Sequence, residues 1–247
     1  MATPYFQFKQ FTIWHDKCAM KVGTDGVLLG AWAEVPELSS CKENRRVLDV
    51  GTGSGLIALM LAQRFPVLID GIDIDESAVL QAKENVKNSP FAEKINIYKQ
   101  DFACMQYDSA ANKMNCNQKY DLIVSNPPFY VEDTISGNGT RDAARHTSSL
   151  PFIDLIHNAS SMLTDEGLFT VIIPAVAASD FISLCVMNRL YLRRRLDIRT
   201  TETKEPKRTM LEFSRKITDT NSYVLSLRNK NNELSEEYKA LTKDFYL

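Results

Sequence analysis

Residues 46–55 read RVLDVGTGSG, and this stretch decides the fold. Residues 46–50 have the apolar, β-branched character of a buried strand, and an apolar helical pattern follows over 55–64. Glycines stand between the two segments, at positions 51, 53 and 55. Glycine lets the backbone turn tightly and approach a ligand where a Cβ atom would collide. The stretch therefore predicts the strand–loop–helix unit at which α/β folds bind ligands.

Strand and helix patterns alternate after this unit. The expected strands are 46–50, 67–73, 95–99, 120–125 and 168–173, and the expected helices are 55–64, 76–88, 150–163 and 176–188. Such alternation predicts an α/β fold with a doubly wound, mostly parallel sheet covered on both faces. Three later segments, 191–199, 208–215 and 223–227, are expected to be strands that pair antiparallel at one sheet edge. The tail from Ser235 has the pattern of a final amphipathic helix.

The residues before the first strand predict a small N-terminal cap over 1–40, on a single domain that spans 1–247. Residues 5–14, YFQFKQFTIW, are rich in aromatic and β-branched residues and indicate a short hairpin. An apolar helical pattern begins after Thr24 and Asp25, so one of these two residues is the expected N-cap.

Composition excludes several classes of protein. The N-terminus has no signal-peptide pattern, and no apolar run reaches the roughly 18–20 residues of a membrane span. Five scattered cysteines and three histidines form no metal-ligand spacing, so we expect reduced thiols, a cytoplasmic location and no metal. The net charge of −2 does not by itself indicate a nucleic-acid partner, and nothing in the sequence implies an oligomer.

The glycine-rich loop favours one cofactor chemistry over another. A dinucleotide site has the spacing G-x-G-x-x-G, whereas this loop has G-x-G-x-G preceded by Asp49. A carboxylate there would repel a pyrophosphate but suits a cationic amino-acid headgroup, directly or through water. The loop therefore favours S-adenosylmethionine over NAD.

Two further acidic residues follow predicted strands. Asp73 lies at the end of the second strand, where an acid can accept hydrogen bonds from both ribose hydroxyls. Asp75 is expected to be the N-cap of the next helix. Asp101 follows the third strand, with Phe102 beside it, and can accept a hydrogen bond from an adenine amine, although a loop aspartate is otherwise commonplace.

The stretch 121–130, DLIVSNPPFY, ends a core strand on an amide, two prolines and an aromatic ring. Prolines stop a strand, but the side-chain carbonyl of Asn126 and the main-chain carbonyl of Pro127 can also hold both N–H groups of one planar amine. Neither Pro127 nor Pro128 has an N–H that would compete. Such a clamp helps the nitrogen become tetrahedral and aims its lone pair at a methyl donor.

Phe129 completes the motif with a flat apolar face. A nucleobase stacked on it would gain roughly 1–3 kcal/mol, after unstacking at a cost of a few kcal/mol. Packing of this ring in the core is the alternative.

The glycine-rich loop and the Asn126–Phe129 motif together resemble those of a known enzyme family. Asn126-Pro127-Pro128-Phe129 together with Asp49-x-Gly51-x-Gly53 resembles the amino-group methyltransferases that use S-adenosylmethionine. The stretches KQFTIWHDKCAMKVGTDGVLLGAW and SEEYKALTKDFYL narrow the resemblance, over nearly the whole chain, to the bacterial tRNA1(Val) (adenine(37)-N6)-methyltransferase family. The resemblance implies a Rossmann-like class I methyltransferase fold and methylation of N6 of the adenosine just 3′ of the anticodon of valine tRNA.

The resemblance also implies roles for individual residues. Those expected to hold the target base are Asn126, Pro127 and Phe129, and those expected to hold the cofactor are Asp49, Gly51, Gly53, Asp73 and Asp101. The segment 15–26, HDKCAMKVGTDG, is expected to close over the methionine end of the cofactor, with Lys21, Thr24 and Asp25 as candidate contacts.

Basic segments become candidate tRNA contacts. Between Arg189 and Lys216 lie ten Lys or Arg against four Asp or Glu, which on composition alone is equally well a solvated surface. The candidates for phosphate contacts are Arg193, Arg194, Arg195, Arg199, Lys207 and Arg208. Because neighbouring strand residues point to opposite faces, 193–195 cannot all touch RNA. The polar stretch 130–149 predicts a loop that is mobile without RNA and offers Arg141, Arg145 and His146 near the target base.

Other functions use the same motifs. A protein glutamine N5-methyltransferase would bind a carboxamide in the same clamp, but such enzymes carry a helical recognition domain, and about forty residues precede the first strand here. An rRNA guanine N2-methyltransferase also fits the clamp. A non-catalytic RNA-binding module is disfavoured by the intact Asp49, Asp73 and glycines, and an NAD-dependent dehydrogenase by the loop.

Overall fold

The computed structural model describes residues 3–18, 21–36, 45–104, 118–128 and 150–247. Its main element is an eight-stranded sheet built from β3 (Arg46–Val50), β4 (Leu68–Asp73), β5 (Ile95–Lys99), β6 (Tyr120–Ser125), β7 (Leu163–Pro174), β8 (Tyr191–Thr201), β9 (Arg208–Ser214) and β10 (Asn221–Arg228). The strand order is β10-β8-β9-β7-β6-β3-β4-β5. All neighbouring pairs in this sheet are parallel except the two that involve β9. The predicted α/β fold with a mostly parallel sheet is confirmed. The expected antiparallel pairing is present for β9, which lies between β7 and β8, but is wrong for β10, which pairs parallel with β8 and forms the sheet edge.

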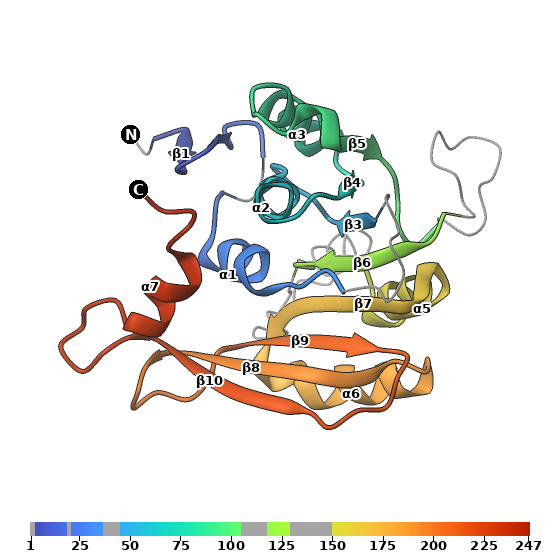
Figure 1. Cartoon of the computed structure of the whole chain (residues 1–247), viewed down its shortest axis with the longest axis vertical. Helices are drawn as coiled ribbons and strands as arrows, with labels where there is room; N and C mark the ends of the chain where they lie inside the picture. The colour runs from blue at the N-terminus through green and yellow to red at the C-terminus, as the bar shows by residue number, and fades with distance from the viewer. Residues whose placement is uncertain (1–2, 19–20, 37–44, 105–117, 129–149) are drawn as a thin grey trace, which may run out of the picture.

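Helices cover both faces of the sheet (Figure 1). They are α1 (Thr24–Trp32), α2 (Leu56–Arg64), α3 (Glu76–Lys87), α5 (Phe152–Met162) and α6 (Ala178–Met187). Leu122 and Val124 of β6 belong to the apolar cluster with α1, α2 and α3, and Ile123 between them belongs to the cluster with α5 and α6. The continuous apolar run of β6 thus supplies both faces, as a parallel strand buried on two sides requires. No helix in the described ranges is both long and apolar enough to cross a membrane.

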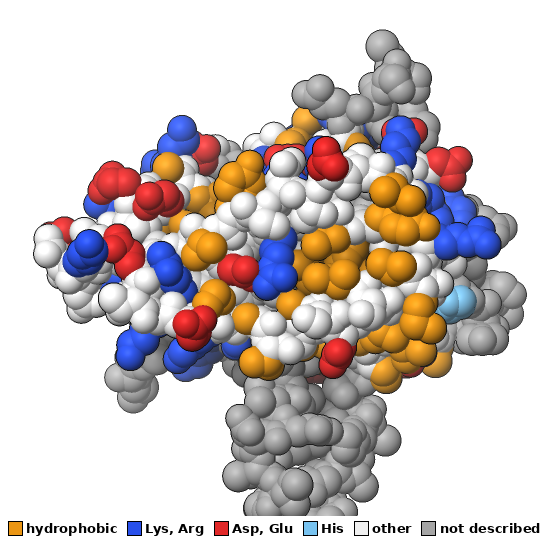
Figure 2. All heavy atoms as spheres, turned by 90° about the horizontal axis from the view of Figure 1, so that it is seen from below, with side chains coloured by type: hydrophobic (Ala, Val, Ile, Leu, Met, Phe, Trp, Pro, Cys, Tyr) orange, Lys and Arg blue, Asp and Glu red, His pale blue; other side chains and the backbone are white. Residues whose placement is uncertain are grey.

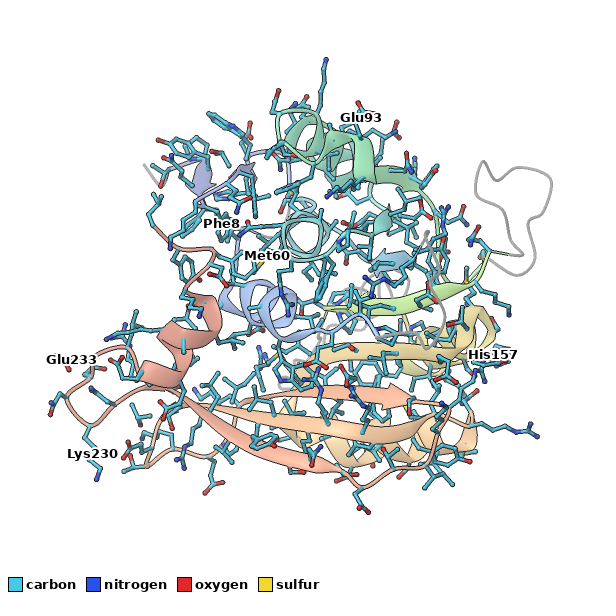
Figure 3. The ribbon with its side chains drawn as sticks, in the orientation of Figure 1. Phe8, Met60, Glu93, His157, Lys230 and Glu233 are labelled. Atoms are coloured by element: carbon cyan, nitrogen blue, oxygen red, sulfur yellow. The ribbon has the colours of Figure 1, made fainter. Side chains whose placement is uncertain are left out.

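The start of α1 differs from the sequence expectation. The N-cap is Gly23, with no side-chain cap, rather than Thr24 or Asp25. Asp25 instead accepts a hydrogen bond from Nε of Arg208 at 2.8 Å, and this tertiary ion pair takes the carboxylate away from the helix end. Asp75 does cap α3 as predicted, because its Oδ1 accepts a hydrogen bond from the amide of Ser77. Further along α1, Gly30 faces Met60 of α2, where a Cβ atom would lie 2.7 Å from the sulfur (Figure 3).

The two ends of the chain pack together. The predicted hairpin is present as β1 (Tyr5–Gln7) and β2 (Thr12–Trp14), and the predicted last helix as α7 (Glu236–Thr242), with Ser235 as its N-cap. The ring of Phe8, labelled in Figure 3, stacks on Phe11 at 4.9 Å and on Tyr246 at 6.0 Å between centroids. The amide of Lys9 donates to the carbonyl of Phe245 at 2.8 Å. The N-terminal hairpin is therefore anchored on the C-terminal segment.

Candidate active site

The carboxyl edge of the parallel strands brings the predicted site residues into one row. Val50 at the end of β3 pairs with Ile72 of β4 on one side and with Ser125 of β6 on the other. The hydroxyl of Ser125 also donates to the carbonyl of Val50 at 2.9 Å, which fixes the end of β6 against β3. The next residues along these three strands are Gly51, Asp73 and Asn126. Cofactor and base-clamp candidates thus meet at the edge where open α/β sheets bind ligands.

The glycine-rich loop needs glycine for its backbone conformation. Gly51, Gly53 and Gly55 have φ angles of 72°, 55° and 83°, a region that L side chains rarely adopt. A Cβ atom added to Gly51 or Gly53 would meet no heavy atom within 4 Å. The loop therefore presents bare backbone to open space, which suits a ligand that approaches closely.

Asp49 lies beneath this loop. Its side chain is fully buried, and its Oδ2 accepts hydrogen bonds from the hydroxyl of Thr52 at 2.7 Å and from the amide of Ala58, near the start of α2, at 3.2 Å. Its Oδ1 has no hydrogen-bond partner in the described structure. Burial raises the pKa of Asp49 to about 7, which the two hydrogen bonds oppose and the nearby charge of Asp73 reinforces. Asp49 thus holds the loop, and its predicted contact with a cationic headgroup stays a prediction.

Asp73 is oriented by the same loop. One carboxylate oxygen accepts from the amide of Gly53 at 2.8 Å and the other from the amide of Asp75 at 3.0 Å. The side chain is partly exposed, so its remaining lone pairs are available to hydroxyl donors. These acceptors match the hydroxyls of a ribose, and Asp49, whose Oδ1 has no partner among the described residues, lies one residue before the end of β3, where a cationic headgroup would bind. The residues present therefore fit S-adenosylmethionine.

Asp101 and its neighbour have different environments. Asp101 is partly exposed, and its Oδ1 accepts from the amide of Ala103 at 2.9 Å, which closes a turn after β5. Phe102 is buried in the cluster with α5, and its carbonyl accepts a hydrogen bond from the side-chain Nδ2 of Asn158 at 2.6 Å. Phe102 therefore packs inside the protein, whereas the contact of Asp101 with an adenine stays a prediction.

The clamp motif is described as far as Pro128. Asn126 is partly exposed directly after β6, Pro127 is buried and Pro128 is exposed. Phe129 lies outside the described residues, and so do Arg141, Arg145, His146 and the predicted loop 130–149. Lys21 and Thr24 are exposed at the approach to α1. Their predicted contacts with the cofactor and those of the basic residues with RNA stay predictions.

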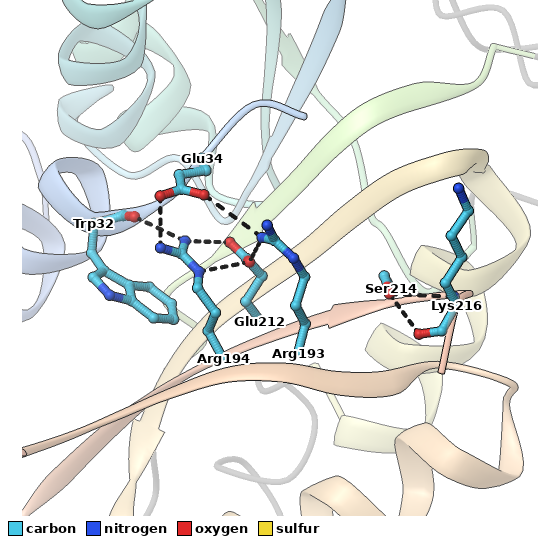
Figure 4. Close-up of polar contacts among 7 residues, drawn as sticks. All are labelled: Trp32, Glu34, Arg193, Arg194, Glu212, Ser214 and Lys216. Carbon is cyan, nitrogen blue, oxygen red and sulfur yellow. Dashed lines mark hydrogen bonds and ion pairs between the residues drawn. The ribbon is translucent and has the colours of Figure 1, made fainter. Parts of the chain in front are cut away.

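Two of the predicted tRNA-contacting arginines share one buried carboxylate (Figure 4). The register of β8 against β9 shifts between Leu192 and Arg194, and this β-bulge lets both Arg193 and Arg194 reach Glu212, which is 0 % exposed. Arg194 also binds Glu34 at 2.7 Å, and its guanidinium lies 4.3 Å from the ring centre of Trp32. Nothing in the local sequence indicates this contact, which spans 160 positions. The cluster links the end of α1 to the sheet.

The register divides the basic segment between two sheet edges. Arg208 pairs with Pro174, the last residue of β7, and the amide of Lys207 donates to the carbonyl of Ile198. These residues lie at the carboxyl edge with Asn126, whereas Ser214, opposite Leu168, places Lys216 at the other edge. Arg195 binds the carboxylate of Asp197. Figure 2 shows basic, acidic and apolar side chains intermixed on the face seen from below. Lys207 is exposed and is therefore the best placed of the predicted contacts whose positions the structure describes.

Comparisons with known proteins show which sequences this chain is similar to. Residues 30–188 match the family model described as methyltransferase small domain. The chain is 44 % identical, over its whole length and 99 % of the relative, to a tRNA1(Val) (adenine(37)-N6)-methyltransferase of Parabacteroides distasonis. It is 42 % identical, over 98 % of its length and 94 % of the relative, to the protein of that name in Escherichia fergusonii.

Solved structures share the fold. A crystal structure described as a predicted O-methyltransferase from Agrobacterium tumefaciens superposes with a TM-score of 0.65, covering 90 % of this chain and 96 % of that one at 14 % identity. The ribosomal protein L11 methylase of Lactobacillus delbrueckii subsp. bulgaricus gives a TM-score of 0.50 over 78 % of this chain and 77 % of that one, at 19 % identity.

Proposed function

Because the chain belongs to the methyltransferase small domain family and, within it, to the tRNA1(Val) (adenine(37)-N6)-methyltransferases, we infer that it methylates N6 of adenosine 37 in tRNA. It is an S-adenosylmethionine-dependent enzyme with a Rossmann-like fold. The tRNA that we propose as its substrate is the valine isoacceptor, which its relatives carry in their name. Among the described residues, Cys18 and Cys185 carry thiols and form no disulfide, and this and a tRNA substrate both suit a cytoplasmic location.

One observation carries the proposal: Asn126 follows β6 in the same row as Gly51 and Asp73. When bound there, S-adenosylmethionine supplies an electrophilic methyl group on a positively charged sulfur. Asn126 and the carbonyl of Pro127 accept the two N–H hydrogens of the target amine and orient its lone pair toward the cofactor side of the edge. The methylated nitrogen is acidic and loses one proton to solvent, so the clamp needs no strong base.

The cofactor candidates have separate tasks. The loop of Gly51 and Gly53 lets the backbone approach the cofactor, and Asp73 accepts from its ribose. Asp49 keeps the loop in place and contributes negative charge below it. Phe129 provides the surface on which the extruded adenine stacks.

The test is methyl transfer from labelled S-adenosylmethionine into unmodified valine tRNA, mapped to the nucleotide by digestion and mass spectrometry. A second tRNA with an adenosine at the same position measures the preference for the valine isoacceptor. We expect label on N6 of adenosine 37, lost in Asn126→Ala and kept in Asn96→Ala, which changes an exposed residue of β5. Label in ribosomal RNA or protein, with none in tRNA, would overturn the substrate assignment.

A further inference from the structure

Asn85 of α3 is a buried amide that joins two segments far apart in the sequence. Its side chain is 1 % exposed. Its Oδ1 accepts from the amide of Trp14 at 3.0 Å, and its Nδ2 donates to the carbonyl of Trp14 at 2.8 Å and to the carbonyl of Ser54 at 2.9 Å. Trp14 ends the N-terminal hairpin, and Ser54 lies in the glycine-rich loop between Gly53 and Gly55. One side chain thus holds both segments.

The segment that follows Trp14 borders the cofactor edge. The amide of Lys17 donates to Oε1 of Gln81, a second buried amide one helical turn before Asn85 on α3. Burial raises the pKa of the Cys18 thiol to about 11, and the negative charges of Asp73, Asp75 and Asp16 contribute in the same direction. Cys18 therefore lies within the electrostatic reach of Asp73, the predicted ribose acceptor.

We propose that Asn85 is a positioning residue for the cofactor, because it fixes the glycine-rich loop and the segment Trp14–Cys18 against each other. On this proposal, which rests on the function proposed above, the loop and the segment form two walls of one cofactor site. Binding of S-adenosylmethionine to the loop and ordering of the segment are then coupled, and the coupling acts in both directions.

The chemistry of the amide explains why this position needs asparagine. A carboxamide is the side chain that offers a donor group with two N–H hydrogens and an acceptor from one planar end. Aspartate has the same shape but would point an oxygen at the carbonyls of Trp14 and Ser54, and alanine would leave three backbone groups, one of them buried, without this partner.

The first measurement is the dissociation constant of S-adenosylmethionine, by calorimetry, in the full-length protein. We expect about a fivefold weaker affinity in Asn85→Ala, because the hydrogen bond to Ser54 that holds the loop is worth about fivefold, and a larger loss in Asn85→Asp. Gln81→Ala is the matched control, because it removes a buried amide that holds the segment but does not contact the loop. It should lower the melting temperature comparably but weaken the affinity by less than Asn85→Ala does, because it loosens the segment and leaves the loop held. A folded Asn85→Ala protein with unchanged affinity would overturn the proposal, as would an equal loss in Gln81→Ala.

Hydrogen exchange in the wild-type protein provides a test that needs no variant to fold. Saturating S-adenosylmethionine should slow exchange of the amides of Trp14 and Lys17 by about tenfold. Unchanged exchange in these amides, with the cofactor bound by calorimetry, would refute the coupling and leave the proposed function standing. Absence of cofactor binding would instead overturn the proposed function and this inference with it.

Discussion

Replacing Asp49 with asparagine should change how the stability of the protein depends on pH. The carboxylate is fully buried, and its pKa rises from an ordinary 3.8 to about 7 in the folded protein. Between these two values the folded state binds a proton that the unfolded state has already released. Stability from Asp49 is therefore fully present below pH 3.8 and is lost as the pH rises toward 7.

The magnitude follows from the size of the shift. One pKa unit corresponds to about 1.36 kcal/mol, so the two units between pH 5 and pH 7 amount to roughly 3 kcal/mol. Asparagine does not titrate, and it can keep the acceptor that Thr52 and Ala58 use. The free energy of unfolding of Asp49→Asn, minus that of the wild type, should therefore increase by about 3 kcal/mol from pH 5 to pH 8.

Urea denaturation without cofactor, followed by tryptophan fluorescence at pH 5, 6, 7 and 8, measures this difference. Groups that titrate in both proteins cancel in the subtraction. Calorimetry on the same samples should show that the wild type binds S-adenosylmethionine more tightly as the pH rises from 6 to 8, since a cation favours ionised Asp49, while the variant shows no such change. A stability difference that stays constant over this range within about 1 kcal/mol would refute the reasoning.

Three other variants test separate parts of the structure. Asn126→Ala should abolish methyl transfer while the calorimetric affinity for S-adenosylmethionine stays within about threefold, because the residue is assigned to the base clamp. Arg194→Met should lower the free energy of unfolding in urea by about 3 kcal/mol, because it leaves buried Glu212 with one cationic partner fewer. Lys207→Ala should weaken tRNA binding and reduce the slope of log K against log salt by about 1, whereas Lys216→Ala at the opposite sheet edge should change neither.

Each of these variants has an outcome that contradicts its premise. Loss of cofactor binding in Asn126→Ala would mean that Asn126 belongs to the cofactor site and not to a separate base clamp. Arg195→Met is the control for Arg194→Met, since Arg195 pairs with the partly exposed Asp197, and equal losses would mean that burial of Glu212 does not set the cost. Equal slopes of log K against log salt for the two lysine variants in filter-binding titrations would show that the two sheet edges do not differ in their contribution to RNA binding.

The strands were predictable where local pattern and tertiary role coincide. β3, β5 and β6 have the bounds expected from the sequence, because β3 and β6 are short apolar runs buried on both sheet faces and β5 alternates buried and exposed residues. β7 begins at Leu163 rather than at residue 168. Its first residues, 163–167, are mostly polar and belong to the strand because Leu163 pairs with Tyr120 of β6. Register of this kind depends on a neighbouring strand and leaves no local signal.

The candidate site was predictable to a smaller extent. Motif residues such as Gly51 and Asp73 carry their chemistry in their spacing, and the sheet brings them together as expected. Long-range polar contacts have no such signal: Asp25 pairs with Arg208 across 183 positions, and a bulge turns Arg193 and Arg194 toward one carboxylate. Basic residues read as an RNA surface thus include some that stabilise the fold.

The packing of Phe8 on Tyr246 has a consequence for synthesis of the protein. A growing chain that has not yet released Tyr246 from the ribosome lacks the ring on which Phe8 stacks, and it lacks the carbonyl of Phe245 that binds Lys9. The hairpin that leads into Trp14–Cys18 therefore docks only after the segment with Phe245 and Tyr246 has been synthesised. Nascent chains and products truncated before α7 would carry the glycine-rich loop and the clamp without this anchored hairpin. Premature termination should therefore yield a methyltransferase core in which the N-terminal hairpin is not held on the C-terminal segment.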